Sequence, residues 1–211
     1  MHKQILAGAE KLGFTVTHSQ AVKMEQYGRE LLLWNKKINL TAITEPAQVA
    51  EKHFIDSMAA ADMVRTCGSL ADMGSGGGFP GIVLKIMNPG LDIVLIDSVR
   101  KKVNFLKHVI RTLELKNIDA VHSRAEDLHA HPDFSGRFDC VISRAFADLD
   151  KFVRLAGPLI HADGRLLAMK GRQGRTEILP EIEAVWQTKT LPYTLPFEQS
   201  QRWLIELSPR P

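Results

Sequence analysis

The glycine-rich segment 72–81 carries the clearest chemical signal in the sequence. It reads Asp-Met-Gly-Ser-Gly-Gly-Gly-Phe-Pro-Gly and directly follows the short apolar run 69–71. Glycine adopts positive φ without strain and lets backbone N–H groups approach a ligand closely, and proline suits the first turn of a helix. The segment is therefore predicted to lead from a strand into a helix and to bind a nucleotide at the helix N-terminus.

An acidic residue follows where a ribose ligand would be expected. A second apolar run, 91–96, ends in Asp97. In doubly wound nucleotide folds, an acid at the tip of the second strand accepts hydrogen bonds from the ribose hydroxyls. Asp97 is accordingly predicted to bind ribose, and the alternative is a cap beside Ser98 at the start of the next helix.

The order of residues in the loop discriminates between nucleotides. A P-loop has lysine and then serine or threonine after its last glycine, whereas Gly81 is followed by isoleucine and valine, which disfavours hydrolysis of ATP or GTP. Segment 76–81 also fits Gly-x-Gly-x-x-Gly, but a single match of this kind is a weak sign of a dinucleotide site. A plain tight linker is the remaining structural alternative.

A tighter match is the pattern acid-x-Gly-x-Gly-x-Gly, spelled by Asp72, Gly74, Gly76 and Gly78. This pattern resembles the first motif of S-adenosylmethionine-dependent methyltransferases. An acid at the mouth of the loop suits a cofactor with a sulfonium and an ammonium group, whereas it would repel a pyrophosphate. The loop is therefore predicted to bind S-adenosylmethionine.

Composition is typical of one main domain with a substantial core. The chain has 211 residues, of which 45% are hydrophobic and 24% charged. No apolar stretch approaches the ~20 residues that span a bilayer, the start lacks a signal-peptide pattern, and Cys67 and Cys140 form no Cys-x-x-Cys pair. We expect a cytoplasmic protein, and the bunched basic residues within a net charge of +3 are compatible with a polyanionic partner.

The first part of the chain predicts a helical layer over residues 1–65. Apolar residues recur at helical spacing over 19–38, namely Met24, Tyr27, Leu31, Trp34 and Ile38. A second helix is predicted to start at Thr44 as N-cap ahead of Pro46 and to run to about Ala61. We expect this layer to pack on a core of residues 66–211 as one compact unit.

After residue 66 the pattern alternates between short apolar runs and helical stretches, which is typical of a parallel sheet with helices on both faces. Strands are predicted at 69–73, 91–97, 118–122, 138–143 and 164–169, with helices near 80–87, 99–115 and 148–160. Two further β-like runs, 188–193 and 202–207, are expected to form an antiparallel pair. Helix 99–115 should bury Val99, Val103, Leu106, Ile110 and Leu113, and expose a basic face.

Five blocks together resemble the bacterial ribosomal RNA small subunit methyltransferase G family, also called glucose-inhibited division protein B. They are Trp-Asn-Lys-Lys-Ile-Asn-Leu-Thr at 34–41, His-Phe-Ile-Asp-Ser at 53–57, Gly-Phe-Pro-Gly at 78–81, Ile-Ser-Arg-Ala-Phe-Ala at 142–147 and Met-Lys-Gly at 169–171. The resemblance covers nearly the whole chain. It implies a Rossmann-like class I methyltransferase fold with a seven-stranded, mostly parallel sheet and an antiparallel C-terminal strand.

The resemblance also implies an activity. It implies a cytoplasmic, monomeric enzyme that transfers the methyl group of S-adenosylmethionine to N7 of a guanine in the 530 loop of 16S rRNA, within the 30S subunit or an assembly intermediate. Two alternatives remain: a methyltransferase of the same fold acting on a small molecule or protein, and a catalytically silent RNA-binding module. A silent module need not bind S-adenosylmethionine, so cofactor binding distinguishes it from an enzyme. Affinity for RNA falls steeply with salt, whereas affinity for a small neutral substrate changes little.

The residues independently suit an N7 target. Guanine N7 has an in-plane lone pair and no proton, so attack on the sulfonium methyl group requires alignment and desolvation but no general base. The Asp/Asn-Pro-Pro-Tyr/Phe motif of exocyclic-amine methylases is replaced here by Ser143-Arg144-Ala145-Phe146, and Cys140 lies mid-strand, where it is expected to be a small core residue. Arg144 and Lys170, at two strand tips, are predicted to act by positioning.

Arg144 is predicted to hold guanine O6, a phosphate or the cofactor carboxylate, and a surface salt bridge is the alternative. The resemblance implies that Ala125 and Glu126 line the adenine pocket, and a plain solvated acid is the alternative for Glu126. The full predicted cofactor set is Asp72, Gly74, Ser75, Gly76, Gly78, Phe79, Asp97, Ala125, Glu126 and Arg144. The RNA-binding set is Asn39, His53, Arg100, Lys101, Arg124, Lys170 and Arg172, of which Asn39 and His53 rest on the resemblance and have structural alternatives. No His/Cys cluster has metal-ligand spacing, so no metal is expected.

Overall fold

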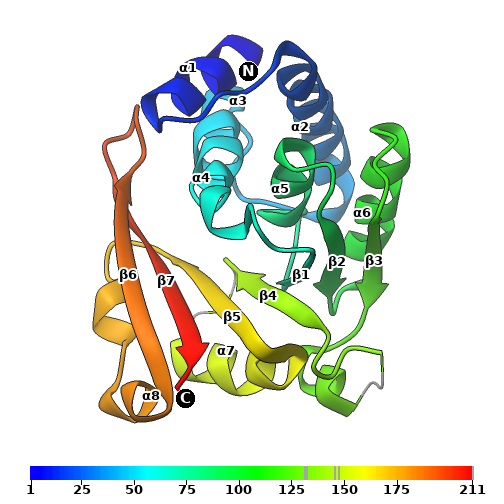
Figure 1. Cartoon of the computed structure of the whole chain (residues 1–211). Coiled ribbons are helices and arrows are strands. Elements are labelled where there is room, and N and C mark those ends of the chain that lie inside the picture. The colour runs from blue at the N-terminus through cyan, green and yellow to red at the C-terminus, as the bar shows by residue number, and fades with distance from the viewer. Residues whose placement is uncertain (131–132, 145, 147, 211) are drawn as a thin grey trace.

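The computed structural model describes residues 1–130, 133–144, 146 and 148–210. Its centre is a seven-stranded sheet in the order β3-β2-β1-β4-β5-β7-β6 (Figure 1). The strands are β1 Ser69–Met73, β2 Asp92–Asp97, β3 Ile118–His122, β4 Phe138–Ser143, β5 Ile160–Lys170, β6 Trp186–Thr194 and β7 Gln201–Pro209. Strands β1 to β5 are parallel, and β7 runs antiparallel to both β5 and β6. The mostly parallel sheet and its antiparallel C-terminal pair confirm the sequence prediction.

Helices cover both faces of this sheet. They are α1 His2–Lys11, α2 His18–Ile38, α3 Pro46–Val49, α4 Asp56–Met58, α5 Gly81–Met87, α6 Arg100–Thr112, α7 Leu149–Ala156 and α8 Pro180–Val185, with a π-helical segment Ala50–Ile55 and 3-10 turns at Asp62–Val64, Ala125–Ala130, Gly157–Leu159 and Gly174–Glu177. Helices α1 and α8 were not predicted. No helix among the described residues is long and apolar enough to cross a membrane.

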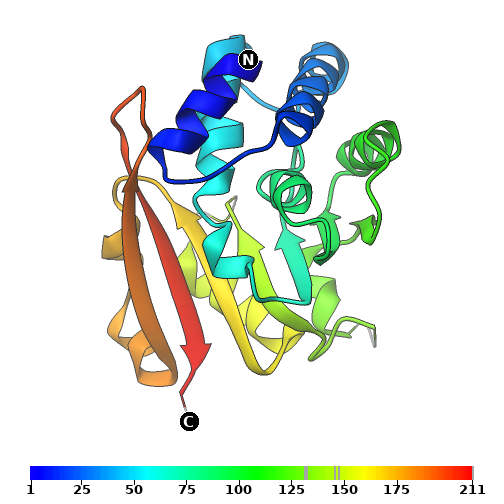
Figure 2. The same ribbon diagram turned by 45° about the horizontal axis from the view of Figure 1, so that its top comes forward.

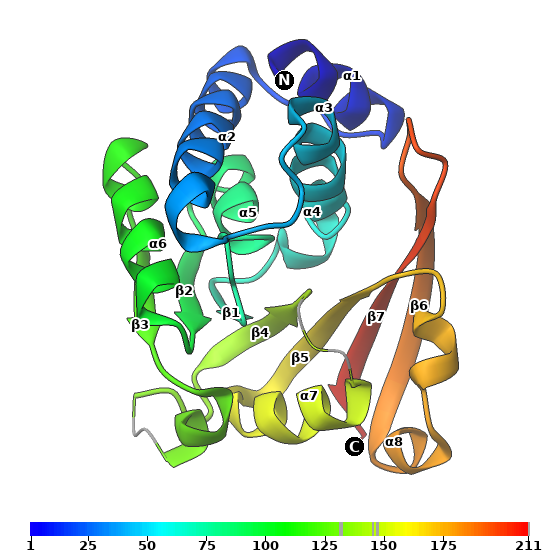
Figure 3. The ribbon, with the colours of Figure 1, turned by 180° about the vertical axis from the view of Figure 1, so that it is seen from behind.

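Two apolar clusters, one on each face, form the core. The larger joins the N-terminal helices, α5 and α6 to one face of the sheet, and the smaller joins α7 to the other face (Figures 1 and 3). Met24, Tyr27 and Leu31 are fully buried, so the predicted stripe of α2 faces the larger cluster. Figure 2 shows α2, α5 and α6 side by side above the sheet. Cys140 is fully buried in the same cluster, as predicted for a core residue.

The segment after residue 44 differs from the single predicted helix. Glu45, and not Thr44, is the N-cap, since the first helical residue is Pro46 and the Glu45 side chain accepts a hydrogen bond from Gln48 N at 2.8 Å. The helix then widens into the π-helical segment Ala50–Ile55 before α4 begins. Such π-helical insertions are frequent at functional sites.

Helix α6 also departs from the prediction at its start. Val99 is 43% exposed because it is the N-cap residue, outside the first helical turn, and not part of the buried stripe. Val103, Leu106 and Leu113 are buried as predicted, and Ile110 is only half-buried. The exposed side of α6 carries Arg100 and Lys101 near the carboxyl end of β2.

Candidate functional site: a cleft at the carboxyl ends of the parallel strands

The loop after β1 is fastened to β2 by backbone hydrogen bonds. Gly74 N and Ser75 N both donate to Ile96 O, at 2.9 and 3.0 Å. Ser75 Oγ donates to Asp72 O at 2.8 Å and accepts from Ile96 N at 3.0 Å. Ser75 is only 2% exposed. Its side chain therefore fixes the loop, and a contact of Ser75 with the cofactor stays a prediction.

Asp72 lies beneath this loop and not at its mouth. It is fully buried, and its Oδ2 accepts a hydrogen bond from Gly81 N at 2.9 Å. Burial raises the pKa of Asp72 to about 7, against the opposing effect of the Gly81 N–H and of Arg144. Its Oδ1 has no hydrogen-bond partner in the described part of the chain. The expectation of a surface acid that attracts the cofactor is thus wrong, because the side chain faces α5.

The loop glycines serve different purposes. Gly76 has φ +57°, and the nearest atom to a Cβ there would be Gly74 O at 3.9 Å, so this position faces open space. Gly78 has φ +93°, and a Cβ there would lie only 2.5 Å from Tyr27 Oη. Gly78 is therefore required by packing against α2, and it does not line the cleft as a predicted cofactor residue would.

Asp97 lies where both of its predicted roles would place it, and its binding of ribose stays a prediction. Its Oδ2 accepts from Gly76 N at 2.9 Å, and its Oδ1 accepts from Val99 N at 2.8 Å. The carboxylate thus supports the start of α6 and at the same time lines the cleft. Because each oxygen keeps a second lone pair, the carboxylate can also accept hydrogen bonds from a ribose held against the loop.

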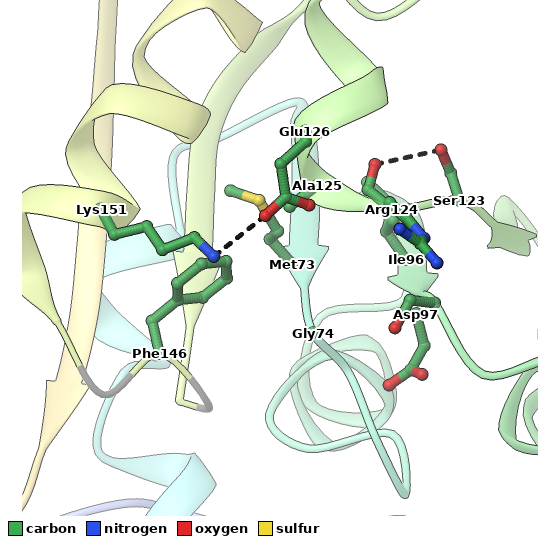
Figure 4. Close-up of a pocket in the computed structure, with 11 residues that line it drawn as sticks. Met73, Gly74, Ile96, Asp97, Ser123, Arg124, Ala125, Glu126, Phe146 and Lys151 are labelled. Atoms are coloured by element: carbon green, nitrogen blue, oxygen red, sulfur yellow. Dashed lines mark hydrogen bonds and ion pairs between the residues drawn. The ribbon is translucent and has the colours of Figure 1, made fainter.

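A cleft of about 410 Å³ opens beside this carboxylate (Figure 4). Its walls come from the ends of β1, β2 and β3, from the turn after β3 and from α7. It is lined by Met73, Gly74, Ile96, Asp97, Ser98, Ser123, Arg124, Ala125, Glu126, Phe146 and Lys151. The tertiary structure therefore brings together five residues expected in the site: Gly74, Asp97, Arg124, Ala125 and Glu126.

An ion pair between Glu126 and Lys151 lies in this cleft. Glu126 Oε1 lies 2.9 Å from Lys151 Nζ, next to the ring of Phe146 in Figure 4. Both side chains are about half exposed, at 53% and 51%, so water screens the pair and it contributes little to stability. The carboxylate of Glu126 can therefore exchange this partner for a ligand at small cost.

Arg144, which follows β4, points toward the π-helical segment. Its Nη1 donates to Lys52 O at 2.8 Å and lies 3.3 Å from Asp56 Oδ2, and its Nη2 lies 3.2 Å from His53 Nδ1. The guanidinium also lies 5.3 Å from the centre of the Phe79 ring. Arg144 joins β4 to the N-terminal layer, and it does not line the cleft.

His53 is enclosed by polar groups at both ring nitrogens. Its Nδ1 lies 3.2 Å from Arg144 Nη2 and 3.1 Å from Lys52 O, and its Nε2 lies 2.8 Å from Thr41 Oγ1. Burial, together with the charge of Arg144, lowers the pKa of His53 to about 3. His53 is therefore neutral, and its exposure of only 7% favours its structural alternative, while its predicted RNA contact stays a prediction.

Phe79 is a core residue and not a wall of the cleft. Its ring stacks between Tyr27 at 4.9 Å and His53 at 4.7 Å, and it is 4% exposed. Tyr27 also donates a hydrogen bond to Gly77 O, so α2 is fastened to the glycine loop. The blocks of the N-terminal layer thus support the cofactor loop from below.

Lys170 is not the free surface cation that was expected. Its side chain is 6% exposed, and Nζ donates to Phe146 O at 2.8 Å and to Glu177 Oε2 at 2.5 Å. Asn39 is exposed with φ 50°, and it ends α2 in the left-handed conformation, which was its structural alternative. The remaining predicted RNA contacts, Arg100, Lys101, Arg124 and Arg172, are all exposed.

Sequence reasoning missed the residues that the C-terminal strands bring to Arg144. Tyr193 Oη donates to Asp56 Oδ1 at 2.7 Å, and Arg202 Nε lies 4.0 Å from the same oxygen. Asp56 had been noted only within a motif block, and no sequence spacing connects it to β6 or β7. Ala145 and Ala147 of the 142–147 block lie outside the described residues.

The fold and cleft define a class of protein. Solved structures with the same fold include a predicted O-methyltransferase from Agrobacterium tumefaciens, with TM-score 0.58 and 20% identity over 72% of this chain and 79% of that one. Another is a SAM dependent methyltransferase from Aquifex aeolicus, with TM-score 0.56 and 14% identity over 77% and 93% of the two chains. The architecture is that of the class I S-adenosylmethionine-dependent methyltransferases.

Sequence similarity narrows this class to one family. The family model described as rRNA small subunit methyltransferase G matches residues 20–205. Proteins named ribosomal RNA small subunit methyltransferase G are 47% identical in Geotalea uraniireducens, over 83% of this chain and 79% of the relative, and 41% identical in Geobacter metallireducens, over 95% and 93%. The chain belongs to the rRNA small subunit methyltransferase G family, and it is a methyltransferase with S-adenosylmethionine as cofactor. The family resemblance and the cofactor predicted from the sequence are confirmed.

Proposed function

We propose that this protein transfers the methyl group of S-adenosylmethionine to N7 of a guanine in the 530 loop of 16S rRNA. The observation that carries the proposal is the cleft beside Asp97 at the carboxyl ends of the parallel strands. The relatives' names supply the rRNA of the small subunit as the substrate class. Neither a small molecule nor a protein substrate has comparable support.

The residues of the cleft fit the cofactor. Asp97 would accept hydrogen bonds from the ribose, and the backbone of Ala125 and the carboxylate of Glu126 would contact the adenine. The open side of Gly76 leaves room for the amino-acid portion at the loop. When bound, the cofactor supplies an electrophilic methyl group on a sulfonium ion.

The mechanism rests on positioning. Guanine N7 is already unprotonated, so no side chain has to remove a proton. His53 is not offered to the substrate as a proton acceptor, because its imidazole is buried and both ring nitrogens face protein groups. Arg144 therefore acts by holding the segment Ala50–Asp56 against β4, which keeps water out of the site and fixes the approach of the base.

Exposed basic residues near the cleft would contact the rRNA backbone. Arg124 lines the cleft, and Arg100 and Lys101 lie at the start of α6 close to Asp97. Phosphate contacts of this kind give affinity and orientation without reading the base. Recognition of the 30S subunit or of an assembly intermediate by a monomer remains part of the proposal.

The test is methyl transfer from radiolabelled S-adenosylmethionine onto total RNA and onto 30S subunits from cells that lack the enzyme. We expect label in 16S rRNA alone, with the modified guanine mapped to the 530 loop. The control is Gly76→Val, whose Cβ would enter the ligand side of the loop at a position with φ +57°, so that cofactor binding is lost. Label in 23S rRNA, tRNA or protein would refute the proposed substrate.

A further inference from the structure

A second, smaller cavity lies beside Arg144 and shares no lining residue with the cofactor cleft. It has a volume of about 160 Å³ and is lined by residues that include Asp56, Arg144, Lys170, Gly171, Tyr193 and Arg202. Water occupies about 30 Å³ per molecule, so the cavity holds about five waters. This is enough for a phosphate group with its solvation and too little for a whole nucleotide.

The lining of this cavity has an excess of positive charge. Among the described residues that line it, the only acid is Asp56, whose carboxylate lies 3.3 Å from Arg144 Nη1 and accepts from Tyr193 Oη at 2.7 Å. Lys170 is paired with Glu177. Arg202 has the longest of these ion pairs, 4.0 Å from its Nε to the same Asp56 carboxylate.

Arg202 presents unused hydrogen-bond donors to this space. Its Nε is 4.0 Å from Asp56 Oδ1, beyond hydrogen-bond distance, and its terminal amino groups make no hydrogen bond within the described ranges 1–130, 133–144, 146 and 148–210. The side chain is 26% exposed. A partly buried guanidinium with a free pair of donors is the preferred partner of a phosphate group.

Gly171 keeps the approach to Arg202 open. A Cβ at this residue would lie 3.7 Å from Arg202 Nη1 and would touch nothing else within 4 Å. A larger side chain is therefore tolerated by the fold but would enter the space in front of the guanidinium. Gly171 follows the carboxyl end of β5, and Arg202 lies at the start of β7. They are therefore at the same end of the strands as the cofactor cleft.

We propose that this cavity is a phosphate subsite that holds one phosphodiester of the RNA substrate through Arg202, while the base lies on the other side of Arg144. The subsite rests on the proposed function and adds the C-terminal strands to the substrate surface. Asp56 and Tyr193 are positioning residues, because they orient Arg144 and fill the floor of the cavity.

The test compares Arg202→Ala with the control Arg210→Ala, an exposed arginine at the other end of β7. Undermethylated 30S subunits are the substrate. For Arg202→Ala we expect KM to rise about tenfold with kcat within about twofold, and the slope of log affinity against log salt to fall by about 1. Calorimetric affinity for S-adenosylmethionine and Tm should match the wild type. Arg202→Lys should retain the salt slope with a smaller rise in KM.

A second variant, Gly171→Leu, fills the space in front of Arg202 and leaves all charged side chains in place. Gly171→Leu should raise KM for 30S subunits as Arg202→Ala does, with unchanged affinity for S-adenosylmethionine. Equal effects of Arg202→Ala and Arg210→Ala on KM and salt slope would overturn the subsite. A loss of cofactor affinity in Arg202→Ala would also overturn it, since the cavity would then serve the cofactor carboxylate. Failure of the proposed function is a separate result, because the wild-type enzyme itself would leave 16S rRNA unlabelled.

Discussion

At the scale of single residues, two acids of the cofactor region lie in opposite environments. Asp97 lines the cleft with both oxygens held by backbone N–H groups, whereas Asp72 is sealed under the loop with one oxygen unpaired among the described residues. A carboxylate with fixed donors is ready to bind a ligand, and a desolvated one is stabilised in its protonated form. The two acids therefore give separate predictions.

Asp97→Ala should weaken binding of S-adenosylmethionine by about 1.5–3 kcal/mol, because hydrogen bonds from the ribose to a charged acceptor are lost. Isothermal titration calorimetry measures this directly. Asp97→Asn is the matched control. Its single carbonyl oxygen replaces only one of the two carboxylate acceptors, so its affinity for S-adenosylmethionine should lie between those of the wild type and Asp97→Ala. Wild-type affinity in folded Asp97→Ala would leave Asp97 with only its role at the start of α6.

Asp72 should make the protein less stable as the pH rises. Its pKa is about 7 in the folded protein and near 3.8 when unfolded, so between these values the folded state binds more protons. Its stabilising contribution is complete below about pH 4 and is lost as pH rises through 7. Asp72→Asn, which keeps an acceptor for Gly81 N, should exceed the wild type in stability by up to a few kcal/mol at pH 8. Urea unfolding at pH 8 and pH 4 checks this, and an equal difference at both pH values would contradict it.

At the scale of elements, the π-helical segment Ala50–Ile55 and the first residue of α4 organise the site. Four residues of this stretch contact other elements: Glu51 the β6–β7 turn, the Lys52 carbonyl Arg144, His53 both Thr41 and Arg144, and Asp56 Tyr193. A short irregular helix can direct several polar groups toward different elements, which is a common use of π-helical geometry.

Single-turnover methyl transfer with saturating cofactor should vary less than about threefold between pH 6 and 9, since N7 needs no base and His53, with a pKa of about 3, stays neutral. Arg144→Ala should slow this step at least about tenfold without adding a pH dependence. Arg144→Lys should rescue poorly, because an ammonium group cannot span Lys52 O and His53 Nδ1 as a planar fork does. Arg154→Ala, at an exposed ion pair on α7, is the control.

A rate that climbs tenfold per pH unit across this window would demand a general base and would refute the mechanism. Asp72, whose pKa is about 7, titrates in this range directly under the glycine loop, whereas the Cys67 thiol, whose pKa is also about 7, lies before the amino end of β1. The profile is therefore repeated in Asp72→Asn. An inflection of the pH–rate profile that is absent in Asp72→Asn arises from the ionisation of Asp72 under the loop. An inflection that persists in this variant arises from the chemical step.

At the scale of the whole molecule, the first and last parts of the chain depend on each other. The buried Glu51 accepts hydrogen bonds from Phe197 N and Glu198 N, both at 2.7 Å, and Lys52 pairs with Glu198 at 2.7 Å. The larger apolar cluster joins α2 to the sheet. We propose that the helical layer 1–65 and the core 66–211 unfold as one unit.

Glu51→Ala should lower the free energy of unfolding by about 1–3 kcal/mol, since two backbone donors lose their acceptor. Glu10→Ala, on the exposed side of α1, should change it by less than about 0.5 kcal/mol. Unfolding followed in single-tryptophan variants that retain Trp34 in the helical layer or Trp203 in β7 should give coincident transitions. Two separated transitions in the wild-type background would show that the layers are independent.

Local signals in the sequence determined the secondary structure of the sheet and the identity of the cofactor loop. The runs at 69–73, 118–122 and 138–143 coincide with β1, β3 and β4, because buried parallel strands are short, apolar and bounded by turns. The glycine pattern and the acid at the tip of β2 depend only on neighbouring residues and on strand order. Each family block is a contiguous stretch of sequence, so the blocks also predicted the methyltransferase class without the tertiary structure.

Only the tertiary structure decided which of these residues line the cleft. The motif includes Asp72, Ser75, Gly78 and Phe79. The side chains of Asp72, Ser75 and Phe79 are buried within the fold, and Gly78 packs against α2. The partners of Arg144 come from the helical layer, and Asp56 is joined there by Tyr193 and Arg202 from the last strands. Burial and long-range pairing are properties of the folded chain, so no spacing along the sequence could reveal them.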